Sequence, residues 1–255
     1  MIYLTGDVHF SNLNNHEQKI IGSEIDSAEK YLNILKKYKL ACTLFVNGIS
    51  LQKEPDKIKE LLKYNVELGG HTYDNFGKMN LLKSYFYRKK WGSIYGSNHY
   101  QKKDITKTKK AFEEFGLKMT SWRTHAFGSN DLTFNLLKEL DVKYVSDLVG
   151  DIKPFYKEVM HMPINIPIDQ NTIAYGMLKP ENRNPFASCT KCRIKAEEWF
   201  DILKKRVIEN EKNKIPSIIL IHPATMMVLD NFKLFEEICK FLSKYKSFKI
   251  SEFKL

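Results

Sequence analysis

The stretch IYLTGDVH, residues 2–9, decides the fold. Its apolar start predicts a short buried strand that ends at Gly6, and the polar residues Asp7 and His9 follow at once. The same pattern, an apolar run, a polar end and then a segment of helical periodicity, recurs about seven times without a linker or a change in composition. Strands separated by helices pair in parallel through right-handed crossovers. We therefore expect an α/β fold, a distorted (β/α)7-type barrel, with residues 1–255 forming a single domain.

The apolar periodicity places the individual elements of this barrel. Buried strands are expected at Ile2–Leu4, Ala41–Val46, Val66–Leu68, Lys118–Trp122, Val142–Ser146, Ser217–Ile221 and Phe248–Phe253. Amphipathic helices are expected at Ala28–Tyr38, Pro55–Lys63, Asp104–Phe115, Leu132–Leu140, Ala196–Asn210 and Phe232–Tyr245. The aromatic segment from Phe76 to Gln101 fits neither period.

Histidines and other polar residues gather where four of these strands end. They are Asp7 and His9 after the first strand, His71, Asp74 and Asn75 after the third, Arg123 and His125 after the next, and His222 after Ile221. In a barrel of parallel strands the carboxyl ends meet on one face, and active sites form there. One histidine after a strand is more often a capping or packing residue than a ligand, whereas a histidine at all four ends favours one shared site.

Composition and charge limit the partners. Lysine and arginine number 41 against 30 acidic residues, a formal net charge of +11. This excess is typical of a lysine-rich solvated surface, with attraction to an anionic substrate as the functional alternative. We expect no nucleic acid partner, because the chain has no zinc-finger spacing and no basic block longer than three residues.

The sequence also bears on location and on the cysteines. No apolar run approaches the ~18–20 residues of a transmembrane segment, and MIYLTGDVHF lacks the basic start of a signal peptide, so we expect a cytoplasmic location. Cys42 and Cys239 lie in apolar runs and are expected in the core. Cys189 and Cys192 form one CxxC pair, which lacks the second pair that a zinc knuckle needs, and an incidental metal site is the alternative.

Histidines, an aspartate and an arginine on one barrel face suit metal-assisted hydrolysis. Neutral imidazoles and carboxylates bind Zn²⁺ and similar ions, and a catalytic site keeps one position open for water. A carboxylate can remove a proton from that water while a separate histidine protonates the leaving amine. An arginine beside the carboxylate keeps it ionised.

The strand-end motifs resemble those of the polysaccharide deacetylases, carbohydrate esterase family four, from Tyr3 to about Pro223. Members of that family have a distorted (β/α) barrel and remove acyl groups from amino sugars with one divalent metal. The resemblance of TGDVH to the opening motif implies that Asp7 is the general base and that His9 stands at a metal-binding position. The sequence HTY at His71 resembles the start of the metal motif.

Three later motifs complete the resemblance. Arg123, in SWR, corresponds to the arginine that pairs with the base, and Asp147, in YVSD, corresponds to the aspartate that orients the acid histidine. In LIH, the resemblance implies that Leu220 lines the acyl pocket and that His222 is the general acid.

The chain departs from the family at the metal motif. The family's second histidine, four residues after the first, is Asn75 here. The expected metal set is therefore His9, His71 and Asn75, with Asp74, Asp7 and His125 as open alternatives for the third ligand. Imidazole ligands favour Zn²⁺, and Co²⁺ or Ni²⁺ could replace it.

A second departure affects the substrate site. The family's proline two residues after the arginine is His125 here, so the oxyanion donor falls on the backbone N–H of Ala126 or Phe127. Trp122 and His125 are expected to contact the substrate, together with Leu220.

Two classes of function follow. The first is a metal-dependent hydrolase that removes an acetyl or formyl group from an amino sugar, a cytoplasmic precursor of a surface glycan that is nucleotide- or lipid-linked. An amidohydrolase of a non-sugar C–N bond is its nearest competitor. The second is a non-catalytic barrel that binds a glycan or a partner. The missing metal histidine favours the second class, whereas Asp7, Arg123 and His222 favour the first.

Overall fold

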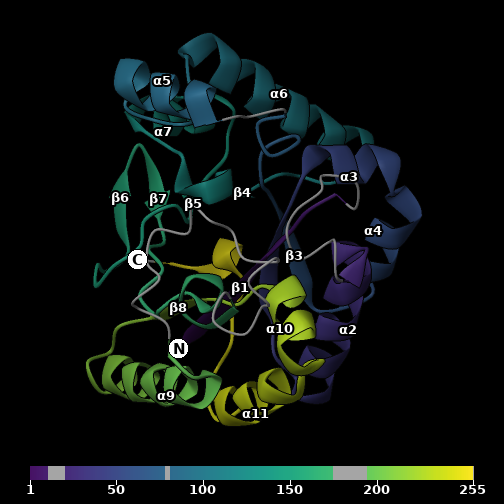
Figure 1. The fold of residues 1–255 in the computed structure, drawn as a ribbon, viewed down its shortest axis with the longest axis vertical. Coiled ribbons are helices and arrows are strands. Elements are labelled where there is room, and N and C mark those ends of the chain that lie inside the picture. Colours follow the sequence, from purple (N-terminus) through teal and green to yellow (C-terminus); the bar gives the residue numbers. More distant parts are fainter. Residues whose placement is uncertain (11–20, 78–80, 175–193, 255) are drawn as a thin grey trace.

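The computed structural model describes residues 1–10, 21–77, 81–174 and 194–254. Its centre is a curled eight-stranded sheet in the order β6-β7-β5-β4-β3-β2-β1-β8 (Figure 1). The strands are β1 Ile2–Val8, β2 Cys42–Val46, β3 Val66–Gly70, β4 Ser121–Trp122, β5 Tyr144–Val145, β6 Phe155–Lys157, β7 Val159–His161 and β8 Ser217–Leu220. All neighbours are parallel except β6, which pairs antiparallel with β7.

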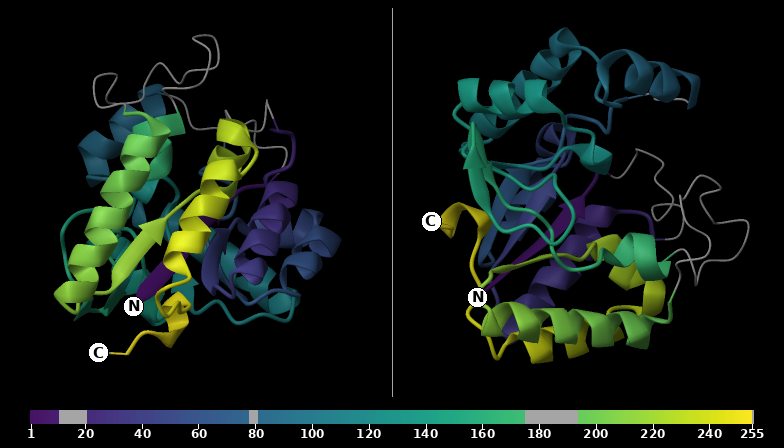
Figure 2. Two further views of the ribbon diagram at one scale, coloured as in Figure 1. Left: turned by 90° about the horizontal axis from the view of Figure 1, so that it is seen from below. Right: turned by 90° about the vertical axis from the view of Figure 1, so that its left-hand side faces the viewer.

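Helices cover the outside of this curled sheet (Figure 2). They are α2 Glu24–Lys37, α3 Gly48–Lys53, α4 Pro55–Leu61, α5 Leu81–Trp91, α6 Asn98–Glu114, α7 Asp131–Glu139, α9 Ala196–Lys212, α10 Pro223–Asp230 and α11 Lys233–Leu242. Short helical turns lie at η1 His125–Phe127, η2 Gln170–Ala174 and η4 Ile250–Glu252. No helix in the described part of the chain is long and apolar enough to cross a membrane.

The alternation of side chains along β1 separates two cores. Leu4 and Val8 face the helix layer and join the larger apolar cluster, whereas Tyr3 faces the interior with Phe45 of β2 and Leu220 of β8. Successive side chains of a strand point to opposite faces, so Asp7 shares the interior face with Tyr3. Asp7 is also paired in register with Phe45 of β2, which belongs to the same interior cluster.

The sheet does not close into a full barrel: its edge strands are β6 and β8, and the chain that follows β7 packs along β8. Met162, Ile164 and Ile168 join the interior cluster. The N–H of Asn165 donates to the carbonyl of Ile218 at 3.2 Å, which ties this segment to β8. Irregular chain therefore lies where a regular barrel would have a further strand, and the barrel is distorted for this reason.

The predicted α/β class and distorted barrel are confirmed, with local corrections. β1 runs to Val8 instead of ending near Leu4, because Gly6 continues the parallel pairing with Leu44. The expected strand at Phe248–Phe253 is wrong: this segment contains the 3-10 turn η4, whose Ile250 N–H donates to Thr43 Oγ1 at 2.9 Å. Cys42 and Cys239 are free and buried, as predicted, and Cys189 and Cys192 lie outside the described residues.

A buried carboxylate of α6 holds the loop that follows β3. Both oxygens of Asp104 accept the backbone N–H of Tyr73 at 3.2 Å, and one of them accepts the hydroxyl of Tyr95 at 2.7 Å. Tyr73 lies two residues after His71, so this contact fixes backbone beside a predicted site residue. Burial raises the pKa of Asp104 to about 7, and the hydrogen bonds from Tyr95 and Tyr73 oppose that shift.

We predict that Asp104 makes stability fall as the pH rises. Its pKa is raised in the folded chain, so its contribution is fully present below about pH 4 and is lost as the pH approaches about 7. Between pH 5 and pH 8 the free energy of unfolding should decrease by ~1 kcal/mol or more in the wild type relative to Asp104→Asn, which has no titrating group. Urea denaturation at the two pH values measures this difference, and equal decreases in both proteins would contradict it.

Candidate active site

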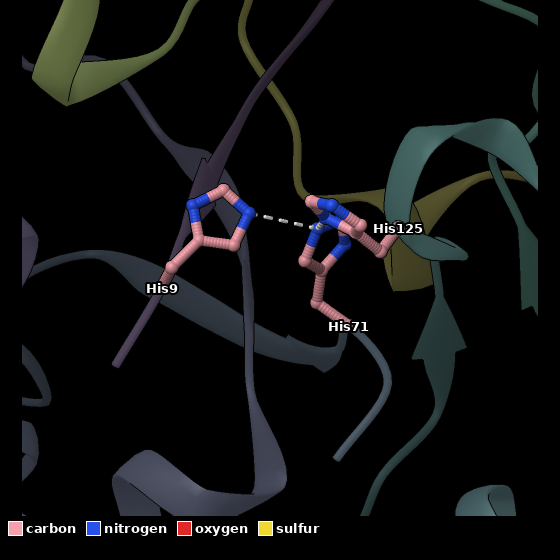
Figure 3. Close-up of side chains that lie close together, drawn as sticks. All are labelled: His9, His71 and His125. Carbon is pink, nitrogen blue, oxygen red and sulfur yellow. Dashed lines mark hydrogen bonds between the residues drawn. The ribbon is translucent and has the colours of Figure 1, made fainter. Parts of the chain in front are cut away.

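Three imidazoles converge at the carboxyl ends of three parallel strands (Figure 3). His9 follows β1, His71 follows β3, and His125 begins η1 just after β4. The Nε2 atoms of His9 and His71 are 3.2 Å apart, and Nδ1 of His125 is 3.3 Å from Nε2 of His71. One ring nitrogen from each residue lies within 4.8 Å of the others. This cluster, His9, His71 and His125, is called the imidazole cluster below.

Hydrogen bonds at the far side of two rings orient their lone pairs. Nδ1 of His71 lies 2.9 Å from the carbonyl oxygen of Arg123, an acceptor, so Nδ1 carries the hydrogen and Nε2 presents a lone pair to the cluster. Nδ1 of His9 lies 2.7 Å from a carboxylate oxygen of Glu24, which orients that ring in the same way. Such outer contacts are usual for metal-binding histidines.

Protonation of the cluster follows from burial and from its charged neighbours. Burial, with His9 and Arg123 adding repulsion, lowers the pKa of His71 to about 3. Burial and the two other rings hold the pKa of His125 well below its usual value. Burial also opposes the charged form of His9, but the Glu24 carboxylate outweighs it and raises the pKa of His9. At least His71 and His125 are therefore neutral at pH 7 and have lone pairs to donate.

The imidazole cluster could hold one metal ion. Two nitrogens bound to one zinc ion at ~2.0–2.1 Å lie roughly 3.3 Å apart, close to the His9–His71 and His71–His125 separations. Three imidazoles with an open fourth position are a set that suits Zn²⁺. The chain thus has residues that could hold the metal expected from its family resemblance.

The predicted ligand Asn75 has its carboxamide engaged with another side chain. Its carboxamide oxygen accepts the side-chain N–H of Asn47 at 2.9 Å. His125, one of the alternatives left open by the sequence, supplies the third imidazole instead. Of the other two alternatives, Asp74 lies outside the cluster, and Asp7 is paired with Arg123.

Asp7 and Arg123 form a buried ion pair beside the imidazole cluster, as the sequence predicts. Nη1 of Arg123 donates to Oδ1 of Asp7 at 2.8 Å, and Nη2 donates to Thr5 Oγ1 at 2.9 Å. The other Asp7 oxygen lies 4.0 Å from Nε2 of His71. Burial alone would raise the pKa of Asp7, but Arg123, followed by His71 and His222, holds it well below its usual value. Asp7 is therefore an ionised carboxylate at neutral pH.

His222 lies on the other side of Asp7 and is oriented by a residue that the sequence did not indicate. Its Nδ1 is 2.7 Å from Oδ1 of Asp169, and its backbone N–H donates to the other oxygen of that carboxylate at 2.9 Å. Its Nε2 is 3.7 Å from Asp7. The one signal for Asp169 is an acidic residue directly after three alternating isoleucines, Ile164, Ile166 and Ile168.

The prediction that Asp147 orients His222 is wrong. Asp147 accepts the backbone N–H of Thr124 at 2.6 Å and its hydroxyl at 2.7 Å. Burial raises the pKa of Asp147 to about 6, opposed by the bonds from Thr124. Asp147 therefore anchors the backbone between Arg123 and His125.

The other predicted substrate-binding residues, Trp122, Leu220, Phe127 and Ala126, lie in different parts of the barrel. Trp122 packs in the outer core against Gly70, on the face of β4 opposite to Arg123, so its expected contact with substrate is wrong. Leu220 is fully buried in the interior cluster, against which Phe127 also packs. Ala126 follows His125 in a left-handed conformation with φ 52° and ψ 27°.

The backbone of this turn separates the two candidate oxyanion donors. The N–H of Phe127 donates to the carbonyl of Thr124 at 2.9 Å, and the N–H of Gly128 donates to that of His125 at 3.2 Å. The structure records no hydrogen bond for the N–H of Ala126 to any residue it describes. Ala126 is therefore the better candidate to donate to a ligand.

Comparison with known proteins shows similarity to the polysaccharide deacetylases in sequence and in fold. The polysaccharide deacetylase family model matches residues 22–145. The peptidoglycan-N-acetylglucosamine deacetylase of Bacillus cereus is 28% identical over 144 residues, which cover 53% of this chain and 58% of that protein. The chain thus matches little more than half the length of this relative.

Two solved structures show the same fold. A family 4 carbohydrate esterase from Streptomyces lividans superposes with a TM-score of 0.52 and 12% identity, over 95% of this chain and 88% of that one. The allantoinase Puue superposes with a TM-score of 0.63 and 13% identity, over 98% of this chain and 86% of that one. The chain is similar to the polysaccharide deacetylases in the matched sequence and shares the fold of these two structures. The resemblance to the polysaccharide deacetylases, predicted from the strand-end motifs, is confirmed.

We predict that the protein binds one Zn²⁺ ion through the imidazole cluster. Replacing His9, His71 or His125 singly by alanine should each reduce bound zinc to well below one ion per chain, since each removes one of three ligands. Asn75→Ala is the matched control and should keep stoichiometric zinc. Elemental analysis of protein dialysed against zinc gives the content, and full zinc retention in His125→Ala would exclude His125 as the third ligand.

Proposed function

We propose that this protein is a metal-dependent hydrolase that removes an acetyl or formyl group from an amino sugar. The observation that carries the proposal is the position of Asp7, whose free oxygen lies 4.0 Å from the imidazole cluster and 3.7 Å from His222. An ionised carboxylate and a histidine thus lie next to each other and beside three imidazoles that could bind a metal ion. That arrangement suits hydrolysis of an amide.

The residues divide the proton transfers between them. Asp7, ionised because Arg123 pairs with it, accepts a proton from the water that attacks the acyl carbon. His222 donates a proton from Nε2 to the amine nitrogen as the C–N bond breaks, and Asp169 stabilises the cationic ring that performs this step. We assign the Ala126 N–H to the developing oxyanion, because the structure records no other acceptor for it among the described residues. A divalent ion in the imidazole cluster would supply Lewis acidity at the acyl group and lower the pKa of a water.

Two other functions compete with this proposal. An amidohydrolase acting on a non-sugar C–N bond would use the same residues, and the allantoinase fold shows that such a protein can share this barrel. A non-catalytic glycan-binding barrel would have no need for a base, its arginine and an oriented acid histidine. The three pairs Asp7–Arg123, His222–Asp169 and His9–Glu24 therefore favour an enzyme.

The substrate proposal is an amino sugar on an anionic carrier, nucleotide- or lipid-linked. The formal net charge of +11 suits an anionic carrier, and a cytoplasmic location stays a prediction. A screen of N-acetylated and N-formylated amino sugars, free and carrier-linked, with allantoin-like amides as a second panel, would follow release of acid. Turnover confined to the second panel would replace the deacetylase with the amidohydrolase.

The proposed acid and base should each be essential. On the best substrate of the screen, Asp7→Asn and His222→Ala should each reduce kcat by ~10²–10⁴-fold, because each removes one proton transfer. His222→Ala should keep its zinc, since His222 lies outside the imidazole cluster. Steady-state kinetics with zinc analysis measures both effects. Near wild-type turnover in His222→Ala would contradict the mechanism.

The two aspartates should differ in effect, and this difference tests the corrected pairing. Asp169→Asn should lower kcat by roughly 10²-fold, because an amide at Nδ1 can hold the His222 ring in the wrong tautomer and stabilises its cation poorly. Asp147→Asn, which keeps an oxygen for the Thr124 N–H, should lower kcat much less. The pH–rate profile is the second readout, and only Asp169→Asn should move its basic limb to lower pH. An unchanged profile in Asp169→Asn would deny Asp169 this role.

A further inference from the structure

Glu24 is a buried carboxylate with two bonds to one residue of the imidazole cluster. It is the first residue of α2, and its exposed fraction is 2%. A single oxygen, Oε2, lies 2.7 Å from Nδ1 of His9 and accepts the backbone N–H of His9 at 3.0 Å. The side chain of Glu24 thus fixes both the backbone and the ring of His9.

The charges around the cluster give this contact a chemical consequence. Three neutral imidazoles would bring no negative charge to a divalent cation, and the charge of Asp7 is matched by Arg123 at 2.8 Å. Among the described residues, Glu24 is the carboxylate that hydrogen-bonds to a ring of the cluster. A carboxylate bonded to the outer nitrogen of a metal-binding histidine fixes its tautomer and raises its basicity as a ligand.

We propose that Glu24 is a positioning residue that acts through His9, supplying the negative charge for a divalent cation held by the imidazole cluster. The carboxylate keeps the hydrogen of His9 on Nδ1, so that Nε2 presents its lone pair 3.2 Å from Nε2 of His71. This inference rests on the proposed metal site but assigns a residue that the family resemblance did not indicate.

A purely structural role for Glu24 is the competing explanation. The same bonds tie the start of α2 to the end of β1, and their loss would loosen that junction. Glu24→Gln separates the two explanations, because glutamine keeps the length of the side chain and an oxygen to accept both N–H groups but removes the charge. Asp26→Asn is the matched control, since it removes the same charge from the same helical turn at an exposed position.

The experiment is competition for Zn²⁺ between the full chain and a chromophoric chelator, followed at pH 7.5. Glu24→Gln should weaken zinc binding by ~10–100-fold with little change in melting temperature, and Asp26→Asn should stay within about twofold of the wild type. Wild-type affinity in Glu24→Gln overturns the proposal while leaving the metal site intact. A wild-type chain that binds no zinc overturns this proposal and the metal dependence together.

A second variant tests whether Glu24 acts through His9. In the His9→Asp background the ligand carries its own charge and has no ring to orient. Adding Glu24→Gln there should change zinc affinity by no more than about threefold, so the two substitutions should be strongly non-additive. The same 10–100-fold loss in both backgrounds, or loss of the fold in both, makes the role of Glu24 structural and overturns the proposal.

Discussion

The buried ion pair between Arg123 and Asp7 is the interaction on which the site depends. Arg123 is fully buried, and its guanidinium donates to Asp7 and Thr5 of β1 and to the side-chain and carbonyl oxygens of Ser146 after β5. One cation therefore links strands at two sides of the barrel interior. A buried pair is no more stabilising than well-packed apolar residues, but removing one partner costs ~3–5 kcal/mol. Its presence is better explained by a need for an ionised carboxylate at Asp7 than by stability.

The sequence predicted the residues of the site where strand geometry alone decides their place. Asp7, His71, Arg123 and His222 lie at the carboxyl ends of parallel strands, and those ends meet on one face whatever the loops do. The same two-residue period could have corrected Trp122, because a strand that points Arg123 inward must point its neighbour outward. At Phe248–Phe253 the alternation was real, but only the N–H of Phe248 pairs with Ile2 of β1, and the chain then forms a helical turn that hydrogen-bonds to Thr43.

Residues carried by irregular chain could not be predicted in this way. Asp169 lies in the irregular segment that follows β7, and the path of this segment follows from filling the interior with Met162, Ile164 and Ile168. No periodicity indicates which carboxylate of such a segment meets His222. His125, which the sequence left open as one of several third ligands, enters the imidazole cluster through a turn with left-handed residues at Ala126 and Phe127, which ordinary propensities disfavour. That conformation is visible only once the backbone is known.

The buried acids of the site differ in their partners, and this difference separates chemical from structural roles. Asp7 pairs with Arg123, Asp169 with His222, and Glu24 with His9, so each of these carboxylates faces a nitrogen group that is or can become cationic. Asp147 instead bonds to the hydroxyl and backbone of Thr124, and burial raises its pKa to about 6. A carboxylate matched to a cation can stay ionised in a dry interior and act on a reaction or a metal. A carboxylate held only by neutral donors is suited to fixing backbone. Asp147 and Asp7 both lie near the carboxyl end of a strand, so this position does not by itself identify a catalytic residue.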